Sequence, residues 1–143
     1  MQYPNDKLMN LVRIGQLKTE PPDQREIDGL VGSAGRRLID AQNASNASDS
    51  RFSLAYDAAH SLALAALRWH GFRPSNRYVV FQALPHTLDF PGAKWRLLSD
   101  CHQKRNAALY DGDMADDEQL IKELVATTTE LERMVIAMGP IAV

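Results

Sequence analysis

Arg105, Asn106 and Tyr110 place a guanidinium, an amide and a phenol close together near the end of a long amphipathic segment. An abrupt acidic turn, Asp111-Gly112-Asp113, follows them. Helices that only fill a core rarely need this set of polar groups, so the stretch is the first candidate for a functional site. The structural alternative is a helix end at which Arg105 makes a cation–π contact with the tyrosine or an ion pair with Asp111 or Asp113.

Other sequence patterns that carry chemistry are absent or weak. The histidines show no paired i, i+4 spacing, and a single cysteine cannot build a structural zinc site, so no metal is expected. The chain has no nucleophile elbow, no Walker sequence and no dinucleotide fingerprint, so no cofactor is expected. Cys101 stands in the middle of an expected helix beside Leu97 and Leu98, which predicts a core thiol and not a nucleophile.

The spacing of apolar residues predicts that the elements positioning this stretch are helices. Residues 77–84 also suit a strand, but they are interpreted as a helix because the sequence offers no second strand to pair with them. Residues 85–91 are expected to form an irregular link. The expected helices span 6–17, 22–39, 48–71, 77–84, 92–109 and 115–138.

The longest expected helix, 48–71, carries a continuous apolar stripe rich in alanine, which lets partner helices come close. Ser48 or Asp49 is expected to cap its first turn. Asp57, His60 and Arg68 fall on its polar side. His60 is therefore expected to be a solvated or hydrogen-bonded surface histidine.

The simplest architecture is all-α, an up-and-down four-helix bundle with one or two short helices appended. With 143 residues, the chain is long enough for a single core, so residues 1–143 are expected to form one domain. Three glycines in the second expected helix, Gly29, Gly32 and Gly35, predict the close approach of a neighbouring backbone.

Composition limits the classes of function. The net charge of -2 argues against gross electrostatic wrapping of nucleic acid but leaves room for a local basic patch, and residues 92–109 are the most basic segment. A single cysteine forms no internal disulfide, the first residues do not form a signal peptide, and no stretch is apolar enough to span a membrane. A cytoplasmic protein without a membrane partner is therefore expected.

Around Arg105 the sequence resembles the HEPN family (higher eukaryotes and prokaryotes nucleotide-binding), whose members are small helical bundles. These domains carry an arginine, then a polar residue that is often asparagine, and then a histidine after four to six intervening positions. Arg105 and Asn106 match the first two elements, and Tyr110 stands where a four-residue spacing puts the histidine. The resemblance covers about residues 51–135, with matching context at 56–67, 71–73, 81–84, 110–112 and 123–124.

The resemblance implies a metal-independent endoribonuclease, often the toxin of a toxin–antitoxin pair or an effector in phage defence. Such proteins form homodimers in which two copies of the motif face each other across a cleft, and a nucleotidyltransferase-like antitoxin is the partner to look for. The resemblance assigns Arg105 to the phosphorane oxygens, because a guanidinium holds two phosphate oxygens in a fixed geometry. It assigns Asn106 to orienting the phosphate or a partner group by hydrogen bonding.

Tyr110 is the departure from the family pattern. A phenol has an unperturbed pKa near ~10, so it is a poor general base at neutral pH. Three outcomes stay open: the site only binds RNA or a nucleotide, Tyr110 positions groups without moving protons, or His102, one helical turn before Arg105, supplies the base. A plain helical interaction protein, such as an antitoxin or adaptor, is the alternative outside the family.

Overall fold

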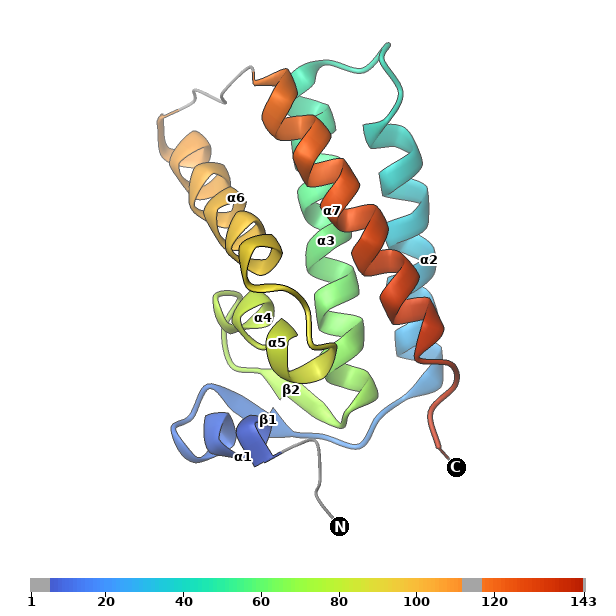
Figure 1. Cartoon of the computed structure of the whole chain (residues 1–143), viewed down its shortest axis with the longest axis vertical. Helices are drawn as coiled ribbons and strands as arrows, with labels where there is room; N and C mark the ends of the chain where they lie inside the picture. Colours follow the sequence, from blue (N-terminus) through green and yellow to red (C-terminus); the bar gives the residue numbers. More distant parts are fainter. Residues whose placement is uncertain (1–5, 112–116, 143) are drawn as a thin grey trace.

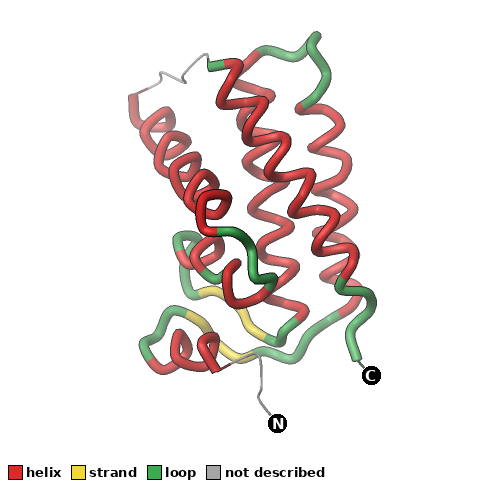
Figure 2. Tube along the Cα trace, viewed as in Figure 1, coloured by secondary structure: helices red, strands yellow, loops and turns green. Residues whose placement is uncertain are grey.

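The computed structural model describes residues 6–111 and 117–142, without the side chains of 107–111, and it is mostly helical, which confirms the all-α class. No helix in these ranges is long and apolar enough to cross a membrane. The elements in chain order are α1 (Asp6–Arg13), β1 (Leu17–Thr19), α2 (Gln24–Ala41), α3 (Ser48–Trp69), β2 (Phe72–Pro74), α4 (Val79–Gln82), α5 (Leu84–Thr87), α6 (Gly92–Asp111) and α7 (Glu118–Ala137) (Figures 1 and 2).

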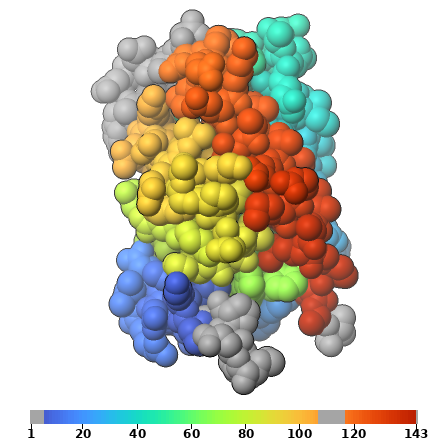
Figure 3. All heavy atoms as spheres, in the orientation of Figure 1, coloured from blue at the N-terminus to red at the C-terminus, as the bar shows by residue number. Residues whose placement is uncertain are grey.

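The helix α3 is central, with α2 and α7 packed along it and α6 on its other flank (Figure 1). Figure 3 shows α6 and α7 side by side on one face of the molecule. Alanines dominate the buried surface of α3, and their small side chains let the neighbouring helices approach closely. Those with no exposed surface are Ala55, Ala58, Ala59, Ala63, Ala65 and Ala66.

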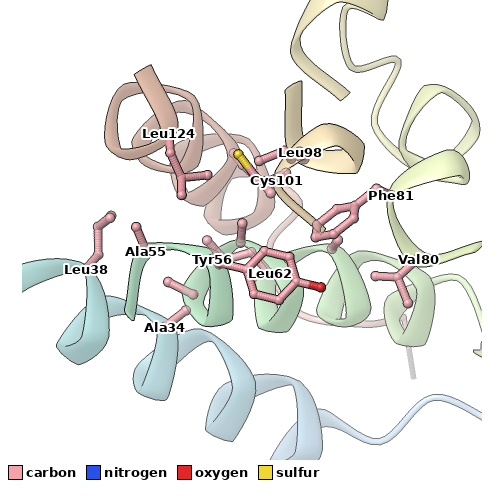
Figure 4. Packing of buried hydrophobic residues seen from close by; sticks show 14 of the residues in the cluster. Ala34, Leu38, Ala55, Tyr56, Leu62, Val80, Phe81, Leu98, Cys101 and Leu124 are labelled. Atoms are coloured by element: carbon pink, nitrogen blue, oxygen red, sulfur yellow. The ribbon is translucent and has the colours of Figure 1, made fainter. Parts of the chain in front are cut away.

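The main core lies around α3, between α2, α6 and α7. Figure 4 shows Ala34 of α2 close to α3, and Leu98 and Cys101 of α6 with Leu124 of α7 across α3 from it. A second, smaller core joins α1, β1, β2 and α4 to the end of α3. Its buried members are Leu8, Leu17, Leu67, Phe72, Val79 and Ala83.

A two-stranded antiparallel sheet interrupts the helical pattern, and the expectation that the chain offers no second strand is wrong. Strand β1 pairs with β2 in the register Leu17 to Pro74 and Thr19 to Phe72. The first helix is shorter than expected because Gly15 adopts a positive φ of 81°, which ends α1 and turns the chain into β1. Strands of three residues are too short for an alternating pattern to be visible, and burial of Leu17 and Phe72 stabilises them.

Local details of the helices correct three further expectations and confirm one. Ala47 is the N-cap of α3 and its side chain makes no capping bond, so neither Ser48 nor Asp49 has that role. The short helix α5, with Pro85 in its first turn, occupies part of the expected irregular link. The glycines of α2 do not face a neighbouring backbone: a Cβ on Gly35 would meet Glu132 Oε2 at 3.3 Å, and one on Gly29 would meet nothing within 4 Å. The helix expected over 77–84 is confirmed in type by α4.

Arg68 was expected on the polar side of its helix, and the structure overturns this: its side chain is 1% exposed. Its Nε lies 2.7 Å from Glu26 Oε1, and its Nη2 lies 3.2 Å from Glu20 Oε2. The guanidinium also donates to the backbone carbonyls of Glu20, Pro21 and Phe72 at 2.7–3.1 Å. The segment leading into α2 and the strand β2 close over this side of α3, which helical periodicity alone does not reveal. Arg68 therefore joins the N-terminal elements to the bundle.

Replacing Arg68 should strongly destabilise the fold. In Arg68→Met the two carboxylates and the carbonyls lose a buried cationic partner, and we expect the free energy of unfolding to fall by about 3 kcal/mol. Arg133→Ala is the matched control, because its guanidinium is 74% exposed and 3.7 Å from Glu130, and it should cost less than ~0.5 kcal/mol. Urea denaturation followed by circular dichroism measures both, and equal losses would contradict the assignment.

Candidate functional site

The helix α6 positions the predicted residues His102, Arg105 and Asn106. Leu98 and Cys101 have no exposed surface and anchor this helix in the core. Residues three and four positions apart lie on neighbouring turns of one helix face, so His102, Arg105 and Asn106 fall together. The structure thus brings three of the four predicted site residues into one cluster with α3. Tyr110 lies within α6, but its side chain, like those of Asp111 and Asp113, lies outside the described part of the structure.

His102 is held at both ring nitrogens. Its Nδ1 lies 2.5 Å from the hydroxyl oxygen of Tyr56 on α3, and its Nε2 lies 3.2 Å from Asn106 Nδ2. With a proton on Nδ1, the ring donates to the phenol and accepts from the amide, so one neutral tautomer satisfies both contacts. His102 is 8% exposed and Tyr56 is fully buried, whereas Asn106 is exposed. Nε2 is therefore the ring nitrogen whose partner, the exposed Asn106, solvent or a ligand can more easily displace.

Arg105 connects the same cluster to a carboxylate. Its Nη2 lies 3.2 Å from Asp57 Oδ1, with the two side chains 24% and 35% exposed. Its Cζ also lies 4.9 Å from the centre of the Tyr56 ring, a cation–π distance. Arg105 thus makes both an ion pair and a cation–π contact, but with Asp57 and Tyr56 of α3, while the helix-end partners anticipated from the sequence lie outside the described side chains. The guanidinium is partly open to solvent at the point where it meets the buried phenol.

Aromatic rings form the floor of the cluster. The Tyr56 and Phe81 rings meet edge to face at 5.8 Å, and the His60 and Phe81 rings do so at 6.0 Å. The Tyr78 and His102 rings meet at 5.9 Å with an interplanar angle of 83°. Phe81 is fully buried, whereas Tyr78 is 46% exposed. The site is therefore a small polar cluster at the surface, supported by aromatic packing beneath it.

His60 is not a surface histidine, contrary to the expectation from the helical pattern. Its Nε2 is buried and has no hydrogen-bond partner among the described residues. Burial, and then the charge of Arg77, lower its pKa from 6.5 to about 4. The cause is α4, which brings Phe81 over the face of α3 that carries His60. Since the unfolded chain binds more protons between these two pKa values, His60 favours the folded state above pH 6.5 and this contribution is lost as the pH falls toward 4.

Burial, and then the charges around the cluster, lower the pKa of both imidazoles. Burial lowers the pKa of His102, and the guanidinium groups of Arg77 and Arg105 lower it further. Burial raises the pKa of Tyr56, while the charge of Arg105 opposes that rise. Arg77 is exposed, and no carboxylate within the described ranges forms an ion pair with it. The cluster thus combines neutral proton acceptors with cations at the surface.

Neither Cys101 nor two pockets of the molecule belong to the cluster. Cys101 is fully buried, and burial raises the pKa of its thiol to about 12, which confirms a core cysteine. Two pockets formed by described residues lie away from α6: one is lined by α2, α3 and the end of α7, and the other by the end of α2, α3 and the start of α7. Across residues 6–111 and 117–142, no group of three or more histidine, cysteine or acidic side chains is placed to hold a metal ion.

The contributions of α3 and of the segment before α4 are not visible in the sequence pattern. Helical spacing puts Tyr56 on the apolar stripe of α3 and Asp57 and His60 on its polar side, and it places Arg77 and Tyr78 in a short helix that carries no motif. One signal was available in the sequence. Tyr56 and His60 stand four positions apart, which puts a phenol and an imidazole on one face of α3, and His102 and Asn106 have the same spacing on α6. Which faces meet depends on the packing of α3 against α6.

Comparison with known proteins adds no family to this picture. No protein-family model matches the chain, and no curated protein or solved structure is significantly similar to it. The function of the cluster is therefore argued from its own residues.

Removing the charge of Arg77 should raise the pKa of both imidazoles. In Arg77→Ala we expect the pKa of His60 and that of His102 to increase, with His60 still below 6.5 because burial is the larger cause. Lys104→Ala removes the same charge from the exposed side of α6 and should change neither value. Nuclear magnetic resonance titration of the imidazole nitrogens measures both. Unchanged values in Arg77→Ala would contradict the electrostatic role of Arg77.

Proposed function

We propose that this chain is a HEPN-like RNA-binding protein that cleaves RNA without a metal ion, with His102 as the general base. The observation that carries the proposal is the convergence of Arg105 and His102 on Tyr56, with Asn106 at the outer nitrogen of His102, which places an imidazole of lowered pKa beside a guanidinium at the surface. In the family that the sequence resembles, the base is a histidine at the position that Tyr110 occupies in this chain. His102, one turn earlier on the same helix, takes that role in this proposal.

The geometry supports proton abstraction at Nε2 of His102. The 2.5 Å contact with Tyr56 holds Nδ1, and in the tautomer that carries its proton on Nδ1 the lone pair of Nε2 points toward exposed Asn106. A ribose 2′-hydroxyl that displaces the amide gives its proton to Nε2, and its oxygen attacks the adjacent phosphorus. The bond from phosphorus to the 5′-oxygen then breaks, and the leaving oxygen takes the proton back from the imidazolium. The products are a 2′,3′-cyclic phosphate and a 5′-hydroxyl.

Arg105 supplies the positive charge that the phosphorane oxygens need. Its guanidinium is 24% exposed and is oriented by Asp57 and the ring of Tyr56. A bound phosphate competes with the half-exposed Asp57 for the same donors, and the permanent charge of arginine favours a bidentate contact. Arg77 adds a second cation beside the imidazoles. The patch is local, because the whole chain carries a net charge of -2.

The wider biological setting follows the same proposal. The longer helices α2, α3, α6 and α7 form the up-and-down four-helix bundle of a HEPN domain, and two copies pair so that their α6 sites face one another. The protein acts in the cytoplasm as the toxin-like half of a toxin–antitoxin or defence module. A nucleotidyltransferase-like antitoxin is its partner.

A non-catalytic RNA- or nucleotide-binding module is the second candidate. It is favoured by the fact that both ring nitrogens of His102 and the guanidinium of Arg105 already have partners within the chain. In that case the Tyr56, His102 and Asn106 contacts stabilise the seam between α3 and α6 and move no proton. Binding of RNA without cleavage distinguishes the two candidates.

Cleavage should depend on Arg105 and His102 and not on metal. Incubation of single-stranded RNA with the purified protein in EDTA should yield fragments ending in 2′,3′-cyclic phosphate. Arg105→Ala and His102→Gln should each lower the cleavage rate by about 10²- to 10⁴-fold, because the first loses charge stabilisation and the second loses the base. Gel electrophoresis with end-labelled RNA measures the rates.

Arg96→Ala is the matched control for this experiment. Arg96 is an exposed arginine on the same helix, stacked on Trp95 and away from the cluster, and its loss should leave the rate unchanged. Equal rates in Arg105→Ala and the unmodified protein would sink the enzymatic proposal. RNA binding with no cleavage at all would establish the second candidate.

Tyr56 should act as a positioning residue whose hydroxyl aligns the base. Tyr56→Phe keeps the ring and its packing but removes the contact with Nδ1, so we expect kcat to fall by on the order of 10- to 100-fold while KM stays constant. The same change should cost about 1 kcal/mol of stability. Steady-state kinetics separate the two parameters. A parallel loss of stability with unchanged kcat would assign the hydroxyl to folding alone.

A further inference from the structure

Tyr78 is a large aromatic side chain on the outside of the candidate site. Its 46% exposure makes it one of the few large apolar side chains in the described ranges that lie open to solvent. It stands directly before α4, between the exposed Arg77 and the fully buried Val79. Neither the base nor the cation of the proposed reaction requires an exposed ring at this position.

The backbone and one neighbouring ring hold Tyr78 in place. Buried Val79 anchors the chain on one side, and its amide donates to Asn76 Oδ1 at 3.2 Å. The phenol meets the His102 ring nearly at right angles, with centroids 5.9 Å apart. Such a contact occupies one face or one edge of the phenol, and 46% of the residue's surface is open to solvent. The ring is therefore pre-ordered for stacking and loses little freedom when a planar group binds.

The groups around the open ring suit a nucleotide. Arg77 is exposed and has no carboxylate partner within the described ranges, and its charge reaches His102 strongly enough to lower the pKa of that imidazole. Arg105 and the exposed amide of Asn106 border the same imidazole. An exposed ring against an imidazole that feels two guanidinium charges offers a stacking surface for a base together with nearby cations for its phosphates.

We propose that Tyr78 is a stacking platform for an unpaired nucleobase and that Arg77 holds the adjoining phosphate, so that the site takes single-stranded RNA. This assignment rests on the proposed RNA-binding function and specifies the form of RNA that the site accepts. A base paired within an A-form helix cannot lay its face on a protein side chain, because its neighbours in the stack cover both faces. Stacking on one phenol is tolerant of sequence, since every base has a π face.

The test is a titration that follows binding and not cleavage. Fluorescence anisotropy is measured with a labelled 2′-O-methyl single strand, which lacks the attacking hydroxyl, with the matching duplex, and with an abasic strand of equal length. The unmodified protein should bind the single strand more tightly than the duplex. Tyr78→Ala should weaken binding of the single strand by roughly 5- to 100-fold and leave binding of the abasic strand unchanged.

Two further variants and one control test whether the loss of binding comes from the ring of Tyr78. Tyr78→Phe preserves the ring and should bind as the unmodified protein does, whereas Arg77→Ala should weaken the single strand and the abasic strand equally, because both carry the phosphates. Ile39→Ala, an exposed apolar residue on α2, is the control for lost surface area. Circular dichroism confirms that each variant is folded.

The outcomes separate this inference from the proposed function. If the unmodified protein binds the single strand and Tyr78→Ala binds it equally well, the stacking assignment is wrong and the RNA-binding proposal stands. If the unmodified protein binds none of the three probes, both are wrong. Tighter binding of the duplex than of the single strand would also overturn the stacking assignment.

Discussion

The packing of neighbouring helices around α3 is the constraint on which the rest of the structure depends. Its alanines have no exposed surface, and they let α2 and α7 lie close enough to bury one continuous core. A larger side chain at these positions would force the helices apart and shift the register between α3 and α6. Because Tyr56 reaches His102 across that register, the geometry of the candidate site follows from the close packing of α3.

The polar groups that α3 carries show two different uses of burial. Arg68 at one end is satisfied by two carboxylates and three carbonyls, so it joins the N-terminal elements to the bundle and is largely closed to ligands. Asp57 and His60, in the middle of the helix, are less enclosed: Asp57 pairs with the partly exposed Arg105, and Nε2 of His60 has no partner among the described residues. Partly exposed pairs of this kind are ones that a ligand can replace, which is why the site is sought there.

Electrostatics and burial act in the same direction on the imidazoles. Burial disfavours the charged form of His60 and His102, and the nearby guanidinium groups disfavour it further. A neutral imidazole next to a permanent cation can accept a proton while the cation stabilises negative charge on a phosphate. The same arrangement leaves an exposed phenol, Tyr78, against the ring of His102 at the edge of the site.

The amino-acid sequence by itself determined the helices and the helix that carries the candidate site. Apolar periodicity predicted α2, α3, α6 and α7 closely, because a helix of this length repeats its pattern several times, and the burial of Cys101 followed from its neighbours. Only the tertiary structure decided that Tyr56 meets His102, 46 positions away, that Nε2 of His60 is buried and that Arg68 is enclosed. Periodicity identifies the apolar side of each helix, but the register between two helices and the loops that cover a polar face are set by packing over the whole chain.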